Sequence, residues 1–479
     1  MADVNPFYLG TFIVYLLIVL AIGVWGYTKT TDVMDFWAFG QNMGPWLATW
    51  SFVANFVSAV SVIGFIGAVY GEGYALMTHT IFGLMLGTSA LYFAVDRVRN
   101  LDLLTFPDII ADVTGYDAAR PIAGTVLLGN GWLYLVMQLV GASLLVTAIT
   151  GVPYEYMVWV IGIVFIAYTV LGGLISVAWT DFLQGTVMVA AVLLALGFML
   201  FDLGGFTSIN QQFGALDSSY VNPTAGGAYT ALGIVATIVA FFGTIFTEQN
   251  NIVRIAATKD VRTAKLHLAA SGVILSVFYS ALVILGGATT VALDAGGLSI
   301  ETQDGAFPTL ITEYVPDEVG IILILAVMSA ILSTTDTRLH STGITTARDI
   351  YSYFRPESGD DSQLKVSRLA TIVFGITATA AAVNPPGTII ELYNFRAVLL
   401  TSAFLLPVYM GLYWAGLSGK AILASIVTGA ILGVGTELTG GLFGVPSTFI
   451  GVGSALLVLL LGSVLLSGSE PKGGAMAGD

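Results

Sequence analysis

Long apolar stretches recur along the whole chain and are separated by short polar segments. Each stretch is about 20 residues long, which is the length that an α-helix needs to cross a bilayer. The apolar runs are continuous, whereas the strands of a membrane β-barrel alternate apolar and polar residues. The pattern therefore predicts an all-α membrane protein with about thirteen spanning helices.

The predicted spans fill the chain and leave no room for a separate soluble domain. They lie near residues 7–27, 45–70, 75–98, 121–150, 153–172, 179–203, 228–251, 264–293, 318–345, 366–384, 389–413, 420–437 and 446–467. We interpret residues 1–479 as a single transmembrane domain with its core at 45–413. The spans at 7–27, 420–437 and 446–467 are then peripheral, and residues 468–479 form a short cytoplasmic tail.

Composition agrees with this pattern and excludes several kinds of chemistry. Hydrophobic residues make up 56% of the chain and charged residues only 10%, a balance that no soluble domain has. There is no cysteine, so disulfides, thiol catalysis and thiolate metal sites are excluded. The three histidines lie far apart and show no metal-ligand spacing.

The charged residues predict the orientation in the plasma membrane. Lys and Arg fall in alternate loops, for example Arg97, Arg254 and Lys420, and the opposite loops carry Asp and Glu. The positive-inside rule then places the N-terminus outside and the C-terminus in the cytoplasm, which requires an odd number of spans. No positive charge precedes the first span, so we expect it to be retained rather than cleaved as a signal peptide.

The overall charge is unusual for a membrane protein. The net charge is −14 and the isoelectric point is about 4.5, with the acidic residues mostly on loops. Such a surface stays hydrated in concentrated salt, and this suggests a halophilic source. The hypothesis fails if the protein keeps its fold and activity in dilute buffer.

Two predicted spans, five spans apart, are interrupted by polar and glycine residues at membrane depth. The second carries this interruption at 54–64 and the seventh at 243–251. Paired interruptions in two halves of a chain indicate a transporter binding site, because unwound carbonyls hold cations and half-helix N-termini attract anions. The alternative is a pair of kinked helices that pack through small residues.

The ninth predicted span carries a row of oxygen-bearing side chains. With a helical period, Ala330, Ser333, Thr334, Thr337 and Ser341 fall on one face. Polar groups at membrane depth usually mark an ion or solute pathway, and neutral oxygens suit sodium. A hydroxyl in a membrane helix also commonly bonds to the carbonyl four residues before it, which is the alternative interpretation.

Four stretches resemble the sodium:solute symporter family in the expected order. They are Phe36 to Gly44 with Ser58 to Gly64, Tyr168 to Leu174 with Trp179 to Gln184, Ala330 to Arg338 with Arg348 to Tyr351, and Pro407 to Trp414 with Gly419 to Ala421. The resemblance implies a LeuT-type fold, in which spans 2–6 and 7–11 form an inverted repeat and spans 2 and 7 are discontinuous.

The resemblance also implies sodium sites. The carbonyls of Ala54, Val57 and Ala330 and the hydroxyls of Ser333 and Thr334 would hold one sodium ion between spans 2 and 9. Some relatives bind a second sodium ion. The residues here that match that pattern are Asp181, Ser333 and Thr337, with Asp336 at a further matching position. An alternative role for Asp181 is the N-cap of a cytoplasmic helix end.

Two departures from the family pattern affect the site. Phe56 stands where some proline-transporting relatives have a coupling aspartate, and Val253 replaces a glutamine that is usual before Arg254. Glu248 aligns with a solute-binding asparagine of a sugar-transporting relative.

Glu248 is costly at membrane depth unless it is paired, and three interpretations compete. Glu248 and Arg396 pair with each other, or they bind opposite ends of a zwitterionic solute, since Arg reads carboxylates bidentately. Otherwise Glu248 carries a proton or a cationic solute while Arg396 bonds to Glu391. Further candidates for lining the pocket, each with helix–helix hydrogen bonding as its alternative, are Ser61, Tyr134, Gln138, Gln249 and Asn394.

These observations predict a sodium-coupled secondary active symporter that imports a small organic solute by alternating access. An amino acid, another zwitterion or a carboxylate is the preferred solute, and sodium is the coupling ion. We expect the solute and the lipid bilayer as partners, no nucleic acid, and a monomer or weak homo-oligomer. The alternatives are a proton-coupled transporter of the same fold or a membrane solute sensor. An intramembrane protease is disfavoured, because no histidine follows the rhomboid-like motif at 416–419.

Overall fold

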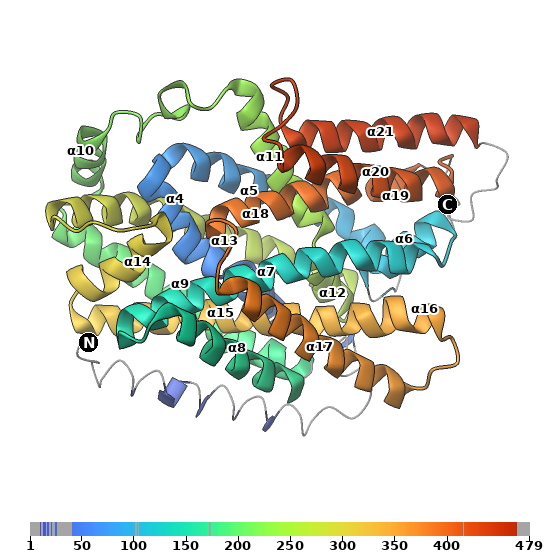
Figure 1. Ribbon diagram of the computed structural model, residues 1–479, viewed down its shortest axis with the longest axis horizontal. Coiled ribbons are helices and arrows are strands. Elements are labelled where there is room, and N and C mark those ends of the chain that lie inside the picture. Colours follow the sequence, from blue (N-terminus) through green and yellow to red (C-terminus); the bar gives the residue numbers. More distant parts are fainter. Residues whose placement is uncertain are drawn as a thin grey trace.

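The structure is a computed structural model. It describes residues 41–466 except 101–102, 104, 172–173 and 415, together with residues 10, 13–15, 17–18, 21 and 24–25. The predicted first span and the tail thus lie largely outside the described residues. Within the described part the chain is helical, with only two isolated β-bridges (Figure 1).

The long helices follow the predicted spans closely. Their bounds are α3 Pro45–Phe56, α4 Phe65–Glu72, α5 Tyr74–Asn100, α7 Ala119–Thr150, α8 Tyr154–Leu171, α9 Leu174–Asp202, α11 Ala231–Thr247, α12 Gln249–Ala256, α13 Val261–Ala295, α15 Asp317–Ile344, α17 Asp360–Ala382, α18 Ile389–Leu400, α19 Leu406–Tyr413, α20 Gly419–Glu437 and α21 Ser447–Leu465. Short elements join or extend them: η2 Val60–Gly64, α6 Phe106–Thr114, α10 Phe206–Leu216, η3 Ala225–Gly227, η4 Gln303–Gly305, α14 Ala306–Thr309, η5 Leu310–Tyr314, η6 Thr345–Tyr351, α16 Ser352–Phe354 and η7 Thr401–Leu405.

Ten helices of the described chain are long and apolar enough to cross a membrane, and a bent pair raises the number to as many as eleven. That pair, Pro45–Phe56 with Val60–Glu72, bends by 53° and is the predicted second span. The predicted fifth span is a shorter apolar helix over Tyr154–Ala167. The total of thirteen therefore stays a prediction, since the first span lies outside most of the described residues.

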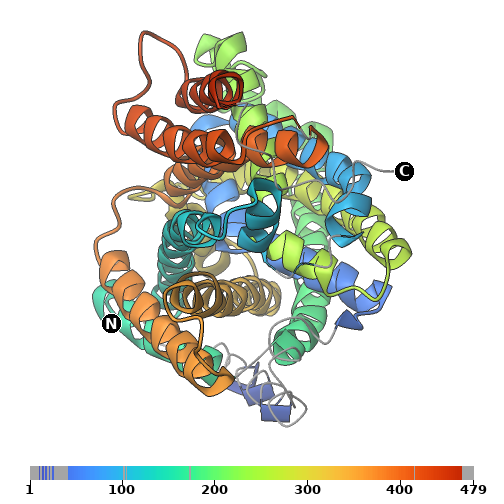
Figure 2. The ribbon, with the colours of Figure 1, turned by 90° about the vertical axis from the view of Figure 1, so that its right-hand side faces the viewer.

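The spans pack as two groups, and one buried helix of the second group, α15, contacts both. The bundle consists of α3, α4, α5, α11, α12 and α13, which contact one another, and the scaffold consists of α7, α8, α15 and α17. Helix α15 lies in the middle of the molecule and packs against scaffold helices, the bundle helix α3 and the intervening α9 (Figure 1). The last two helices, red in Figure 2, pack on each other at the periphery.

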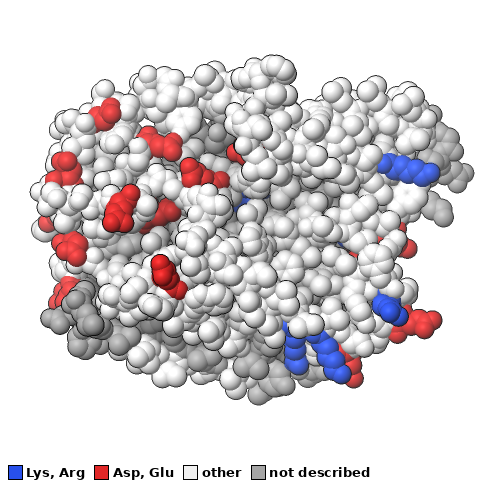
Figure 3. All heavy atoms as spheres, in the orientation of Figure 1, with Lys and Arg blue, Asp and Glu red and all other residues white. Residues whose placement is uncertain are grey.

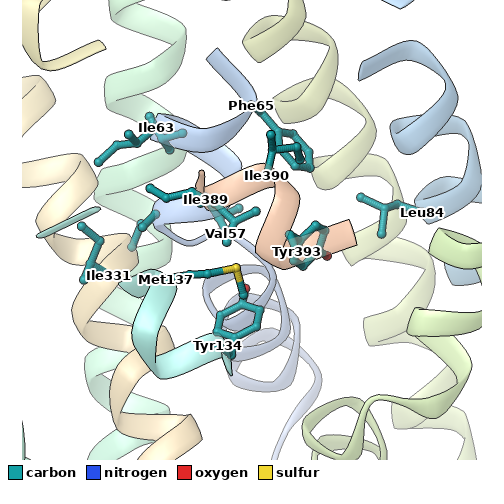
Figure 4. Close-up of a cluster of buried hydrophobic side chains, with 14 of the residues drawn as sticks. Val57, Ile63, Phe65, Leu84, Tyr134, Met137, Ile331, Ile389, Ile390 and Tyr393 are labelled. Atoms are coloured by element: carbon teal, nitrogen blue, oxygen red, sulfur yellow. The ribbon is translucent and has the colours of Figure 1, made fainter. Parts of the chain in front are cut away.

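Close packing between the two groups depends on glycines where backbones approach. A Cβ on Gly141 of α7 would lie 2.6 Å from the Cβ of Ala59, and one on Gly64 would lie 2.8 Å from Ile389. These contacts place apolar side chains of three elements around the bend of α3 and α4. Figure 4 shows Val57 between Ile389 of α18 and Met137 of α7, and all three are fully buried.

Charges separate toward the two ends of the molecule. On the face shown in Figure 3, acidic side chains gather at the end where α10 and α14 lie, and basic side chains lie toward the opposite end. This is the distribution expected from the alternating loops of the sequence.

Candidate functional site

The predicted second span breaks at residues 57–58. Helix α3 ends at Phe56, and Val57 has extended backbone with φ −87° and ψ 132°. Side chains of a neighbouring helix satisfy the backbone that the break exposes: Gln138 Oε1 accepts from the N–H of Ala59 at 3.1 Å, and the Tyr134 hydroxyl donates to Ser58 Oγ at 2.9 Å. Two of the predicted solute-binding residues, Tyr134 and Gln138, thus hold the break in place.

Ser61 lies just beyond the break. Its hydroxyl is 3.0 Å from the hydroxyl of Tyr279 in α13 and donates to the carbonyl of Phe56 at 3.3 Å. Ser61 therefore ties the two halves of the broken span together within the bundle.

The predicted first sodium site lies where this break meets α15. The Thr334 hydroxyl is 3.0 Å from the carbonyl of Val57 and 3.0 Å from the carbonyl of Ala330. Ala54 lies in the last turn of α3, directly after Val53, whose carbonyl accepts from the N–H of the C-cap residue Val57. All of these residues are fully buried. Convergent neutral oxygens at an unwound backbone are the kind of donor set that holds Na⁺, so the residues fit the ion.

Ser333 points to a different partner from Thr334. Its hydroxyl donates to Asp181 Oδ1 of α9 at 2.5 Å. The interpretation of Asp181 as a helix N-cap was wrong, because Asp181 lies well inside α9 and its carboxylate is buried among side chains of three other elements.

An arginine lies in the region predicted for a second sodium ion. The Arg254 Nη2 of α12 is 2.9 Å from Asp181 Oδ2 and donates to Thr337 Oγ1 at 3.1 Å. Ser51 completes the cluster, since it donates to Asp181 at 2.7 Å and accepts from Arg254 at 3.0 Å. Asp181 and Thr337, which were predicted to bind a second sodium ion, thus already bind the positively charged guanidinium of Arg254.

Asp336 belongs to another surface of α15. It is buried, and its Oδ1 accepts from Thr169 of α8 at 3.3 Å. Within the described residues, no group of three His, Cys, Asp or Glu side chains has the spacing to hold a metal ion.

The seventh span breaks at Glu248, whose backbone is extended between α11 and α12. Its side chain is 5% exposed, and its two oxygens form ion pairs with Arg338 of α15 and Arg396 of α18. The pairing of Glu248 with Arg396 was one of the three interpretations. The alternative bond from Arg396 to Glu391 was wrong, because Arg396 Nε donates to Asn130 at 2.7 Å and Glu391 caps α18 through Thr388.

Aromatic rings fix the two guanidinium groups. The Cζ of Arg338 lies 4.1 Å from the ring centre of Tyr134, and that of Arg396 lies 4.6 Å from Tyr134 and 5.0 Å from Tyr393. At this distance the ring quadrupole attracts a cation. Tyr134 therefore links the break of α3 to both arginines.

Arg338 and Asn130 were missed in the sequence. Arg338 ends the polar motif of the ninth span, and an arginine there needs a partner at membrane depth. That requirement was a usable signal, but the partner lies 90 residues earlier in the chain. Asn130 offered no such signal, because a single amide in an apolar helix is common at helix contacts.

Two small cavities, each about 20 Å³ in volume and thus large enough for a single water molecule, are lined by the Glu248–Arg338 pair. Both residues line both cavities. The Phe56 cavity is lined by Asn55, Phe56, Tyr134, Thr244, Ile245, Glu248, Asn251, Arg338, Tyr393 and Arg396. The Thr345 cavity is lined by Leu127, Leu128, Asn130, Gly131, Glu248, Gln249, Asn250, Arg338, Ser341, Thr342 and Thr345.

Of the other residues predicted to line the pocket, Gln249 lines a cavity and Asn394, Gln138 and Ser61 do not. Gln249 lies in the Thr345 cavity, where its amide donates to Thr345 Oγ1 at 3.1 Å. Asn394 follows Tyr393 in α18 and lines neither cavity. Gln138 and Ser61 also lie outside both cavities.

The paired broken spans, the oxygen cluster and the buried cavities define a helical membrane transporter with a LeuT-type fold. The chain matches the Sodium:solute symporter family over residues 36–429 and belongs to that family. It is thus a sodium-coupled solute symporter, not an enzyme.

Similar proteins agree with this assignment. The chain is 28% identical to sodium/proline symporter 2 of Staphylococcus saprophyticus, covering 88% of this chain and 84% of that protein. It is 27% identical to the high-affinity proline transporter of Bacillus subtilis, covering 86% and 88%.

Solved structures show the same fold at lower identity. A Na⁺-coupled sialic acid symporter in a substrate-bound outward-open state matches with a TM-score of 0.80 and 19% identity over 96% of this chain and 97% of that one. The nucleobase-cation-symport-1 transporter Mhp1, in a closed conformation, matches with a TM-score of 0.51 and 13% identity over 93% and 98%.

Proposed function

We propose that this chain imports a small organic solute into the cell together with sodium by alternating access. Sodium binds between the break of α3 and α15, and the solute binds beside Glu248 in the Phe56 cavity. The observation that carries this proposal is the contact of the Thr334 hydroxyl with the Val57 carbonyl, because it joins bundle to scaffold at an unwound backbone. The charge distribution supports a plasma-membrane protein with its acidic end outside and its basic end in the cytoplasm.

The coupling mechanism depends on the contacts that join the bundle to the scaffold. When sodium is bound, it supplies a positive charge among the oxygens of Val57, Ala330 and Thr334. That ion ties the broken bundle helix to the scaffold and so favours one arrangement of the two groups. Sodium and solute each raise the affinity of the other, typically by about 1–3 kcal/mol of coupling free energy.

Release to the cytoplasm requires the bundle to rock away from the scaffold. Two hydrogen bonds on the Thr345 cavity side would open, from Ser341 to Asn250 at 2.5 Å and from Gln249 to Thr345 at 3.1 Å. The ion pair of Glu248 with Arg338 also crosses between the groups. Each contact is polar and directional, so a small rotation exchanges it for water.

One sodium ion per cycle is the stoichiometry that we propose. Arg254 already supplies a positive charge to Asp181 and Thr337, two of the residues that resemble a second sodium site. A second cation in the same place would be repelled by the guanidinium at short range.

Thermal stability of the solubilised protein tests the sodium site without knowledge of the solute. Wild type is compared in sodium and in potassium at constant ionic strength, because a ligand that binds only the native state raises stability by mass action. We expect stabilisation by sodium that Thr334→Ala weakens. Equal stability of wild type in both salts would contradict the site and would direct attention to proton coupling through Glu248.

A further inference from the structure

We propose that the solute is a small organic anion and that Arg338 binds its carboxylate. This inference rests on the proposed function and names the class of solute that the same site takes. It differs from a zwitterionic solute, which is what the proline-transporting relatives would suggest for this chain.

The first observation is the charge count around the two cavities. Among the described residues that line them, Glu248 is the one acid, and Arg338 and Arg396 are the two bases. The site therefore carries one positive charge more than it can neutralise. A buried charge without a counter-charge is strongly unfavourable, so a bound anion would stabilise this arrangement.

The second observation is that Arg338 has hydrogen-bonding capacity to spare. A guanidinium has five N–H donors, and Arg338 uses Nη1 on Glu248. Its Nε is buried and has no hydrogen-bond partner. Arg338 is 5% exposed, and its position over the Tyr134 ring holds the guanidinium plane in the wall of the Phe56 cavity. Planar N–H donors of this kind match a carboxylate bidentately.

Arg396 is engaged more fully and serves as the anchor. It gives Nε to Asn130 and Nη2 to Glu248, and it lies between two tyrosine rings. With Arg396 holding one oxygen of Glu248, Arg338 can turn its remaining donors to a solute while Glu248 stays neutralised.

The third observation is that the site offers an ammonium group no free counter-charge. The one acid that lines the cavities is not free to neutralise the positive end of a zwitterion, because both Glu248 oxygens are already paired with arginines. The other polar groups of the Phe56 cavity are neutral. Among them, Asn251 Oδ1 is buried and has no partner, and it would accept a hydrogen bond from a hydroxyl or N–H of the solute. A small monocarboxylate with one such donor matches the charge and polar groups of the Phe56 cavity, which is about 20 Å³ in this closed arrangement and must widen to admit the solute.

The experiment compares solutes that share a shape and differ in charge. Purified full-length wild type in saturating sodium is heated with L-proline or cyclopentanecarboxylate, which lacks the ring ammonium, and with L-alanine, L-lactate or lactamide. We expect cyclopentanecarboxylate or L-lactate to raise the melting temperature in a saturable way. The zwitterions and the amide should leave it unchanged. Stabilisation by L-proline or L-alanine equal to that by its anionic counterpart would overturn the proposal, as would no stabilisation by either anion.

Variants then locate the charge. Arg338→Gln removes the surplus positive charge, while Arg396 still pairs with Glu248, so we expect the variant to fold. We expect it to bind the anion about tenfold or more weakly than wild type. Arg355→Gln, in an exposed loop, is the matched control and should behave as wild type. Unchanged anion affinity in Arg338→Gln would overturn the role of Arg338. Stabilisation by sodium alone, which reports the symport site, should persist in Arg338→Gln, so failure of the anion site and failure of the proposed function give different results.

Discussion

Arg254 and Asp181 form a buried ion pair, 2.9 Å between Nη2 and Oδ2, that joins α12 of the bundle to α9. The guanidinium also reaches Thr337 of the scaffold. The guanidinium of Arg254 therefore occupies the place where the family resemblance implied a second sodium ion. Removing the guanidinium tests whether sodium can take its place.

Arg254→Gln should create a second site at which bound sodium stabilises the protein. Removing one partner of a buried pair typically costs about 3–5 kcal/mol, because the other charge stays uncompensated. We expect Arg254→Gln to lose stability in potassium and to regain much of it in sodium, which supplies the missing charge to Asp181. Melting temperatures across sodium concentrations measure this. The double variant Asp181→Asn with Arg254→Gln is the control, and an equally large recovery there would contradict the account.

Thr334→Ala should weaken sodium binding without unfolding the protein. The hydroxyl contributes one oxygen to the site, and its loss should raise the sodium half-saturation constant of uptake about fivefold to tenfold. The neighbour Thr335 is the matched control. It is equally buried, but its hydroxyl donates to Ile331 of its own helix at 2.7 Å. Similar sodium constants for Thr334→Ala and Thr335→Ala would remove the hydroxyl from the site.

Asp304 should make the stability of the protein depend on pH. It lies in the loop element η4, it is 4% exposed, and its Oδ2 accepts from the N–H of Ile389 at 2.9 Å. Burial raises the pKa of Asp304 to about 6, and the nearby Glu391 also raises it. The folded state then holds more protons than the unfolded state between the ordinary pKa of Asp and about pH 6.

The sign of the effect follows from that difference. The contribution of Asp304 to stability is largest below its ordinary pKa and falls as the pH rises to about 6. Asp304→Asn keeps an acceptor for Ile389 but cannot ionise. We expect the wild type to lose stability relative to Asp304→Asn across this range, as measured by melting temperature against pH. Asp294→Asn, an exposed acid, is the control, and parallel curves for wild type and Asp304→Asn would refute the assignment.

Gly243→Ala should destabilise the contact between α11 and η7. A Cβ there would lie 2.4 Å from both Cγ2 and Oγ1 of Thr401. Overpacking of this kind typically costs about 1–3 kcal/mol in the free energy of unfolding. Combining Gly243→Ala with Thr401→Ala should recover much of the loss. Gly129→Ala has no heavy atom within 4 Å of its new Cβ and should be neutral or slightly stabilising, so an equal loss there would contradict the packing explanation.

Concentrated salt should be needed for full activity. The net charge of −14 favours a hydrated, salt-screened surface, and like charges repel more strongly as salt is removed. We expect uptake and melting temperature to fall when potassium chloride is lowered from molar to millimolar values at fixed sodium. Full activity in dilute buffer would exclude a halophilic adaptation.

The sequence predicted the spans and both breaks because these depend on local properties. Apolar runs of membrane length and polar residues inside them are visible without any partner, and Val57 and Thr334 were placed correctly beside each other by the family resemblance. The partners of buried charges were harder to predict. Arg338 and Glu248 are far apart in the chain, and nothing in either segment specifies the other.

The roles of amides and hydroxyls were also beyond the sequence. Gln138 and Tyr134 looked like solute ligands because they are polar at membrane depth. Both bond to the break of α3, a partner that exists only once the span is unwound, and Tyr134 also lines the Phe56 cavity. Whether a polar side chain faces a cavity or another helix depends on tertiary packing, which periodicity does not show.

Glu248 and Arg338 line both cavities, so their ion pair belongs to the surface that the two cavities share. A membrane that stores energy as an ion gradient must be electrically insulating, and every carrier embedded in it is a place where current can leak. We expect the charge of this shared surface to contribute to blocking such leakage. In the proposed anion site, the surplus positive charge of the arginines opposes the passage of a lone sodium ion, although that ion can still bind at Val57 and Thr334. Tight coupling is then an electrostatic property of this shared surface, and weakening it would waste the gradient before it abolished transport.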